Sequence, residues 1–298
     1  MIERGPNDGG PSQPHTVMTA PDFLIIGHVA KDVVEGGWRP GGTVTYAATQ
    51  ASRLGLRTGV ITRASEDVDL ARHLPDVCVH RVLSEMTTTF ENRYSEGRRV
   101  QYVRAQAPPI GAEHVPQECR DARIVLLGPL LGEVPIGLAR LFRGAMIGFC
   151  PQGWLREVRP DGLVVRRPWA KPACLRGASV VVVSEEDIED DDGALEQWQG
   201  ESPIVVVTGG RGGARIYVNG RWRKIGAFPH EEVDATGAGD VFAAAFMIAL
   251  DETKDVAGSA RFAAAAAGVS VEGAGTTKVA RREEVEAALA RHPEVVLE

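Results

Sequence analysis

The sequence has few cysteines, no long apolar segment and no sustained basic run. No two of its four cysteines, Cys78, Cys119, Cys150 and Cys174, have the spacing of a metal or redox motif. We therefore expect buried thiols in a reducing compartment. No apolar stretch approaches the length that a membrane span needs, which argues against a membrane protein.

The charge distribution argues against a nucleic-acid-binding surface. The formal net charge is -7, and the basic clusters Arg98-Arg99 and Arg166-Arg167 are too short for such a surface. Residues 1–21 are rich in Gly, Pro, Asn and Ser and lack the order of a secretory signal. We expect them to form a disordered leader on a cytoplasmic protein.

Several catalytic motifs are also missing. A Rossmann dehydrogenase needs Gly-x-Gly-x-x-Gly directly after its first strand, but Gly27 is followed by His28-Val29-Ala30-Lys31. The Gly-x-x-x-x-Gly-Lys-Ser/Thr loop, the His-Glu-x-x-His zinc motif and the Gly-x-Ser-x-Gly elbow do not occur either. These absences exclude the corresponding enzyme classes.

Residues 22–298 have the pattern of one large α/β domain, and 44% of the chain is hydrophobic. The apolar run 23–29, the helical pattern 43–54 and the apolar run 58–62 predict a parallel strand–helix–strand crossover. The fold predicted is a doubly wound, mostly parallel sheet with helices on both faces and a small β lid. Further strands are expected at 124–127, 145–149, 179–183 and 204–207, a hairpin around Asn219-Gly220, and helices at 237–250, 256–270 and 282–291.

A second hairpin is expected at 87–103, where β-prone segments flank the turn Ser95-Glu96-Gly97. Its faces are mixed, so it could cover a cleft rather than join the main sheet. Lid elements are therefore expected near 33–41 and 87–104.

The segment from Asp234 to Phe242, Asp-Ala-Thr-Gly-Ala-Gly-Asp-Val-Phe, is the most informative one. Small residues at the start of a helix leave main-chain N–H groups uncovered, and these groups together with the helix dipole form a site for an anion. The pattern alone fits equally well a glycine-rich helix start at which Asp240 is only a cap.

Four segments in order resemble the ribokinase (PfkB) family of sugar and nucleoside kinases. They are Gly27-x-x-x-x-Asp32, Gly41-Gly42 before a helix that ends at Leu54-Gly55, the segment 207–213, and Asp234-x-Thr236-Gly237-Ala238-Gly239-Asp240. The resemblance implies a ribokinase-like fold and an ATP-dependent kinase that phosphorylates a hydroxyl of a sugar or polyol.

The resemblance also implies roles for individual residues. Asp240 would be the catalytic base, and the amides of Gly237, Ala238 and Gly239 would stabilise the transferring phosphoryl group. Asp32, Gly42 and Thr43 would contact the acceptor, and the residues in contact with the nucleotide would be Thr208, Gly210, Gly213 and Thr236. Main-chain carbonyls near Asp234 and Thr236 would bind K⁺, at a site closed by the loop 273–277.

The sequence departs from the family at two places. Ser184 and Asp187 stand where the family often has Asn-x-x-Glu, so they would organise Mg²⁺ through water, although a merely solvated strand end is the alternative. Only eight residues separate Asp32 from Gly41, which implies a trimmed lid and puts a lid-mediated dimer in doubt. Monomer and homodimer stay open.

The acceptor stays open as well. Cys150-Pro151-Gln152-Gly153-Trp154-Leu155-Arg156 and the aromatic Tyr46 resemble the myo-inositol kinase branch, for which Gln152, Glu91 and Asn92 would be acceptor contacts. Turn and lid-surface roles for these three residues are equally open. A nucleoside kinase is an alternative, and so is a non-catalytic nucleotide or sugar sensor on a kinase fold.

Overall fold

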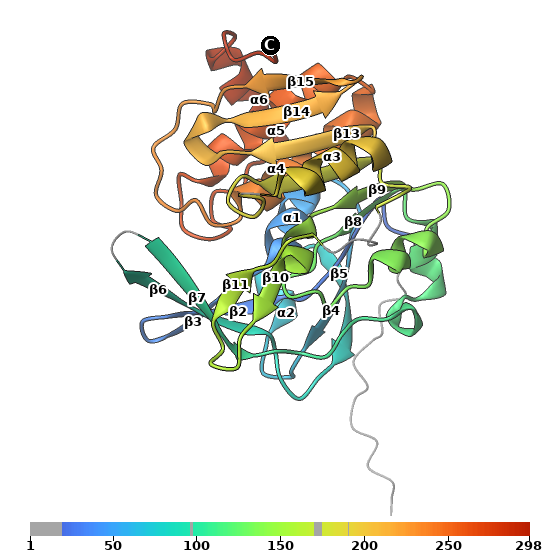
Figure 1. Cartoon of the computed structure of the whole chain (residues 1–298), viewed down its shortest axis with the longest axis vertical. Coiled ribbons are helices and arrows are strands. Elements are labelled where there is room, and N and C mark those ends of the chain that lie inside the picture. Colours follow the sequence, from blue (N-terminus) through green and yellow to red (C-terminus); the bar gives the residue numbers. More distant parts are fainter. Residues whose placement is uncertain (1–19, 96–97, 170–174, 190) are drawn as a thin grey trace, which may run out of the picture.

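The computed structural model describes residues 20–95, 98–169, 175–189 and 191–298. Most of the expected leader, residues 1–19, and Cys174 lie outside the described residues. The body is a large sheet between two layers of helices and loops, and a smaller sheet projects from its lower part (Figure 1). The fold is therefore the mostly parallel α/β arrangement with a small second β-sheet that the sequence predicts.

The main sheet has nine strands in the order β15-β14-β13-β12-β9-β8-β1-β4-β5. The pairs from β13 through β12, β9, β8, β1 and β4 to β5 are parallel, whereas β14 and β15 form an antiparallel edge. Their bounds are β1 Phe23–Ile26, β4 Thr58–Ala64, β5 Val77–Leu83, β8 Ile124–Leu127, β9 Met146–Phe149, β12 Val180–Ser184, β13 Ile204–Thr208, β14 Ala214–Val218 and β15 Arg221–Ile225.

The central strands are apolar because both faces of the sheet are covered. In β1, Phe23 and Ile25 point into one core cluster, while Leu24 and Ile26 point into the other. The first cluster lies under α1, α4 and α5, and the second lies under α3 and short 3-10 turns. The helices are α1 Thr43–Arg53, α2 Leu70–His73, α3 Asp192–Glu201, α4 Ala238–Thr253, α5 Val256–Ser270 and α6 Arg282–Arg291.

The smaller sheet, called the lid below, has the strand order β3-β2-β6-β7. Its strands are β2 Ala30–Val34, β3 Gly37–Gly41, β6 Thr89–Ser95 and β7 Arg98–Ala105. Each end of the lid is an antiparallel hairpin, and β2 pairs with β6 in parallel. The two-stranded ribbon of β10 Arg156–Val158 and β11 Val164–Arg166 lies beside it, with a bridge from Tyr102 to Leu163 (Figure 1).

Local signals explain several element ends. Gly42 has φ 87 before α1, and a Cβ there would crowd the carbonyl oxygen of His28. Asn219 and Gly220 both have positive φ, as a tight two-residue hairpin turn requires. No helix in the described ranges is long and apolar enough to cross a membrane.

Candidate active site

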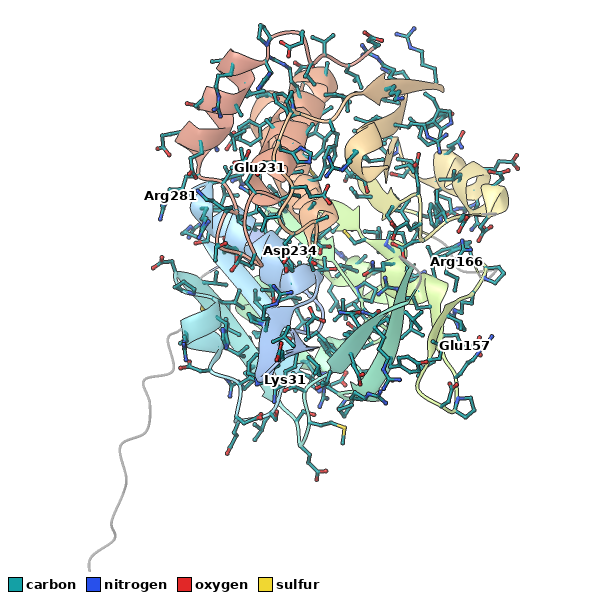
Figure 2. The ribbon with its side chains drawn as sticks, turned by 90° about the vertical axis from the view of Figure 1, so that its left-hand side faces the viewer. Lys31, Glu157, Arg166, Glu231, Asp234 and Arg281 are labelled. Atoms are coloured by element: carbon teal, nitrogen blue, oxygen red, sulfur yellow. The ribbon has the colours of Figure 1, made fainter. Side chains whose placement is uncertain are left out.

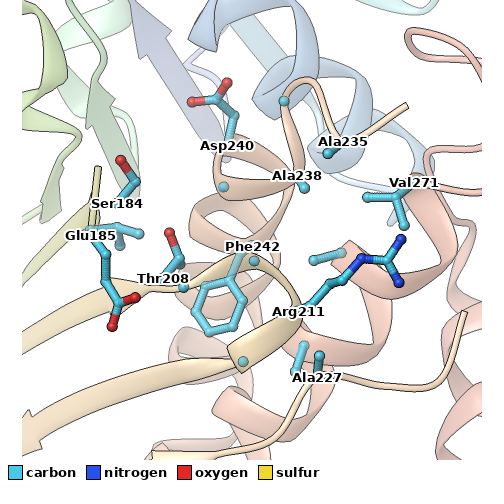
Figure 3. A pocket seen from close by; sticks show the side chains of 18 of the residues that line it. Ser184, Glu185, Thr208, Arg211, Ala227, Ala235, Ala238, Asp240, Phe242 and Val271 are labelled. Carbon is cyan, nitrogen blue, oxygen red and sulfur yellow. The ribbon is translucent and has the colours of Figure 1, made fainter. Parts of the chain in front are cut away.

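A cavity of about 550 Å³ opens at the carboxyl ends of β12 and β13, beside the start of α4. Ligands of open α/β sheets bind at this edge. Figure 3 shows Ser184 and Thr208 on the strand ends and Asp240 on the helix. The lining thus combines three separate segments that the sequence singles out.

The start of α4 supplies main-chain donors to this cavity. Gly237 is the N-cap in the left-handed conformation, with φ 78, and a Cβ at this position would overlap the ring of Tyr46. Among the described residues, the amides of Gly237, Gly239 and Asp240 have no main-chain acceptor, whereas Ala238 N donates to Ala235 O at 3.3 Å. Free amides at a helix N-terminus suit an anion.

Asp240 follows these amides and lines the same cavity. Burial raises the pKa of this carboxyl to about 7. A hydrogen bond from Thr43 and the charge of Arg156 oppose the increase in pKa, while the nearby Asp187 adds to it. Because its side chain is only partly buried, Asp240 can still exchange a proton with a molecule in the cavity.

Asp187 is the centre of a polar cluster next to Asp240. Its Oδ2 accepts hydrogen bonds from Ser184 Oγ at 2.6 Å and Gln152 Nε2 at 3.3 Å. Its Oδ1 lies 3.4 Å from Nη2 of Arg156. A carboxylate has about four lone-pair positions, so these three contacts leave little room for direct coordination of a metal.

Thr208 and the loop after β13 form the floor of the cavity. Gly210 and Gly213 both line it, and Gly213, with φ 84, approaches the carbonyl of Ile225 too closely for any Cβ. Thr236 does not belong to the lining, but its neighbours Ala235 and Gly237 do.

Further from Asp240, the cavity wall becomes apolar. The rings of Phe228 and Phe242 are buried side chains at this wall (Figure 3 labels Phe242). Small residues of α5 and the residue after it complete the wall: Ala264, Ala267, Gly268 and Val271. Arg211 and Glu232 form an ion pair of 3.1 Å at the rim.

On the other side of Asp240 lie residues expected to contact an acceptor. The carboxylate of Asp32 on β2 lies against Gly41, and Thr43 opens α1 beneath Asp240. Tyr46 lies near carboxylates from both sides. Burial raises the pKa of its hydroxyl most, and the charges of Asp234, Asp32 and Asp240 raise this pKa further.

The two lid residues expected at the acceptor differ in their surroundings. Glu91 forms ion pairs of 2.6 Å with both Arg93 and Arg104, so its carboxylate is engaged on the lid itself. Asn92 Oδ1 accepts a hydrogen bond from Gln101 at 3.0 Å.

Asp234 joins two loops next to the helix start. Its Oδ1 accepts from Thr236 N at 3.0 Å, and its Oδ2 accepts from Gly275 N at 3.1 Å and from Arg39 at 3.2 Å. Burial favours the neutral acid, but these hydrogen bonds outweigh it and lower the pKa of Asp234. Asp234 therefore lies between the C-terminal helices and the N-terminal part of the chain (Figure 2).

Other residues of the cavity were not expected from the sequence. Glu185, Phe228 and Glu232 line it, yet the resemblance gives none of them a role. Cys150 and Arg211, which lie within the segments 150–156 and 207–213 of the resemblance, line it as well. Arg156 has no role of its own in the resemblance, but it and Gln152 both contact the carboxylate of Asp187.

Comparisons with known proteins agree with this geometry. Residues 173–282 match the pfkB family carbohydrate kinase model. The chain is 27% identical over 252 residues to a cytidine kinase of Thermococcus kodakarensis, covering 76% of this chain and 87% of the relative. It is 26% identical over 255 residues to an inositol 3-kinase of Oryza sativa subsp. japonica, covering 76% of this chain and 62% of the relative.

A solved structure supports the same assignment over nearly the whole chain. It is a pyrophosphate-dependent kinase in the ribokinase family, complexed with a pyrophosphate analog and myo-inositol, with 26% identity and a TM-score of 0.75. The match covers 89% of this chain and 99% of that one. Residues 173–282 therefore match a pfkB family carbohydrate kinase domain, and nearly the whole chain is similar to kinases of the ribokinase family.

Proposed function

We propose that the protein transfers the γ-phosphate of Mg-ATP to a hydroxyl of a sugar or polyol, with Asp240 as the catalytic base. The observation that supports this most directly is the position of Asp240. Its carboxyl lies in one cavity with the uncovered amides at the start of α4. One group can accept the proton of an alcohol while the others bind the phosphoryl group that the alcohol attacks.

The environment of Asp240 suits a base at neutral pH. A pKa of about 7 makes the carboxylate a better proton acceptor than an ordinary Asp, yet leaves much of it ionised. Thr43 would orient the carboxylate by its hydrogen bond. The amides of Gly237 and Gly239, aided by the helix dipole, would stabilise negative charge on the transferring group.

The residues also suit a magnesium ion held through water. Three contacts already occupy most of the Asp187 carboxylate, so an outer-sphere role with Ser184 fits better than direct binding. Magnesium bound with the donor would neutralise charge on the donor's phosphates. Asp187 and Ser184 would fix the position of its waters.

The shape of the cavity favours ATP over pyrophosphate as the donor. Beyond Gly237 and Thr208, Phe228, Phe242 and Val271 form an apolar wall together with small residues of α5. A purine base needs such a wall, whereas pyrophosphate leaves it empty. Pyrophosphate is the second candidate because the similar solved structure is of a pyrophosphate-dependent kinase.

The acceptor side supports a small polyhydroxylated molecule. Thr43 donates a hydrogen bond to Asp240, and Gln152 lines the same cavity. Together with Asp32 and Asn92 they would bind several hydroxyls, and Gly42 would give close access. We expect Glu91 to contribute less, because two arginines already bind it. myo-Inositol is the specific candidate, and a nucleoside is the alternative that the cytidine kinase relative suggests.

The test is a panel of initial rates with purified protein. Myo-inositol, ribose, fructose, adenosine and cytidine are each supplied with Mg-ATP or with Mg-pyrophosphate, and ADP or phosphate release is measured. We expect release of ADP with at least one acceptor and little turnover with pyrophosphate. Turnover only with pyrophosphate would overturn the donor assignment.

The same panel separates an enzyme from a sensor. Thermal stabilisation by ATP or an acceptor without turnover for any pair would favour a nucleotide- or sugar-sensing protein. A requirement for K⁺ near Asp234 and a cytoplasmic location stay predictions. Monomer and homodimer both stay open.

A further inference from the structure

Arg156 is a partly buried cation between the lid and the cavity. It is the first residue of β10, directly after the turn that contains Gln152, and its side chain is 16% exposed. Its Nη2 lies 3.4 Å from Oδ1 of Asp187, and its Nη1 lies 3.5 Å from Oε1 of Gln101. One guanidinium therefore contacts both the cavity cluster and the lid.

Gln101 continues this connection across the lid. It lies on β7, and its Nε2 donates to Oδ1 of Asn92 on β6 at 3.0 Å. Both ends of the Gln101 amide are fixed by chemistry, because Arg156 can only donate and Asn92 Oδ1 can only accept. The result is a polar chain of side chains from Asp187 through Arg156 and Gln101 to Asn92.

The distances within this row of polar side chains suit a change when the lid closes. The two contacts of Arg156 are at the long end of hydrogen-bonding distance, whereas the contact between Gln101 and Asn92 is of ordinary length. Catalytic hydrogen bonds are often long in the free enzyme and tighten when the ligands are bound. A small movement of β7 toward the body would shorten the contact between Gln101 and Arg156, and a shift of the Arg156 side chain would shorten its contact with Asp187.

We propose that Arg156 is a positioning residue that couples closure of the lid to the alignment of Asp187 at the phosphoryl-donor side. The proposal rests on the proposed function for the location of the donor. Arginine suits this role because its planar fork can hold two partners at once, and lysine has only a point charge to offer. Binding of the donor at Asp187 then orders the lid, and ordering of the lid aligns Asp187.

The test uses hydrogen exchange of the full chain with Mg-ADP as the probe. In the wild type, Mg-ADP should protect α4 peptides and also β6–β7 peptides. In Arg156→Met and in Gln101→Leu, protection of α4 should persist while protection of the lid falls to near the level without ligand. Arg156→Lys keeps the charge and should also lose lid protection, which separates bridging from charge.

Arg166 provides a matched control. It is the register partner of Arg156 in the β10–β11 ribbon, but it is exposed and pairs with Glu189. Arg166→Met should behave as the wild type. With the acceptor that the panel identifies, we expect kcat/KM to fall about 10- to 100-fold in Arg156→Met and Gln101→Leu, the scale of a misplaced catalytic group.

The outcomes separate the two proposals. Equal lid protection in the wild type and Arg156→Met would overturn the coupling while leaving the kinase assignment intact. No protection of α4 by Mg-ADP in the wild type would overturn the nucleotide site and the coupling with it. Circular dichroism and unfolding midpoints check that each variant is folded. If Arg156→Met does not fold, Gln101→Leu alone tests the coupling.

Discussion

Replacing Asp240 by Asn should slow catalysis strongly and stabilise the fold at the same time. The substitution removes the proton acceptor but keeps the size of the side chain. We expect kcat to fall about 10²- to 10⁴-fold, the usual contribution of a positioned acid–base group. The affinity for nucleotide should change much less, because the amides at the start of α4 remain.

The stability effect follows from the raised pKa. Burial holds the pKa of Asp240 at about 7 in the folded state, against 3.8 for an ordinary Asp. The folded state therefore retains the proton more strongly than the unfolded state does. Asp240 does not lower the free energy of unfolding below the unfolded-state pKa, but it lowers this free energy increasingly as pH rises toward 7. The full shift corresponds to about 4 kcal/mol, and screening by water in the cavity should reduce it to about 2 kcal/mol.

The assay is urea unfolding of both proteins at about pH 5 and about pH 8. The advantage of Asp240→Asn in unfolding free energy should be larger at the higher pH. Glu231→Gln is the control, since it removes an exposed carboxylate from the loop before the helix. An advantage that does not change with pH, or an unchanged kcat, would refute the reasoning about this carboxyl.

Three further predictions concern the same site. The kcat/KM of the wild type should rise with pH around an apparent pKa near 7, and a profile flat from about pH 5 to 8 would contradict Asp240 as the base. Thr43→Val should move this rise to higher pH, because the substitution removes a hydrogen bond that favours ionised Asp240; an unmoved profile would argue against the contact. Gly237→Ala should lower kcat at least about 100-fold, because a Cβ is strained at φ 78 and overlaps Tyr46; nearly normal turnover would contradict the role of the helix start.

Local patterns in the sequence predicted much of the fold. The helix expected at 256–270 has those bounds in α5, and the strand at 124–127 has them in β8. These elements have uniform apolar or Ala-rich sequences, so neighbouring residues determine them. The stretch around Gly36 and Gly37, where only a lid element near 33–41 was expected, is a hairpin of two strands. Pairing of β2 with β6 stabilises it from outside the segment, so the local sequence does not predict these strands.

The site was predictable only where a residue has a distinctive local motif. Asp240, Gly237 and Thr208 meet at one cavity, as the motifs around them suggest. The apolar wall and Arg156 could not be found this way. Phe228 has the sequence context of an ordinary core residue, and the contacts of Arg156 depend on a strand and a lid far away in the chain.

Transfer of radiolabelled γ-phosphate from ATP to the acceptor, in a single turnover with excess enzyme, tests the central claim most directly. We expect label to move from ATP to a neutral alcohol with the wild type, and about 10²- to 10⁴-fold more slowly with Asp240→Asn. Label that stays on ATP with every acceptor, or moves equally fast in both proteins, would contradict it.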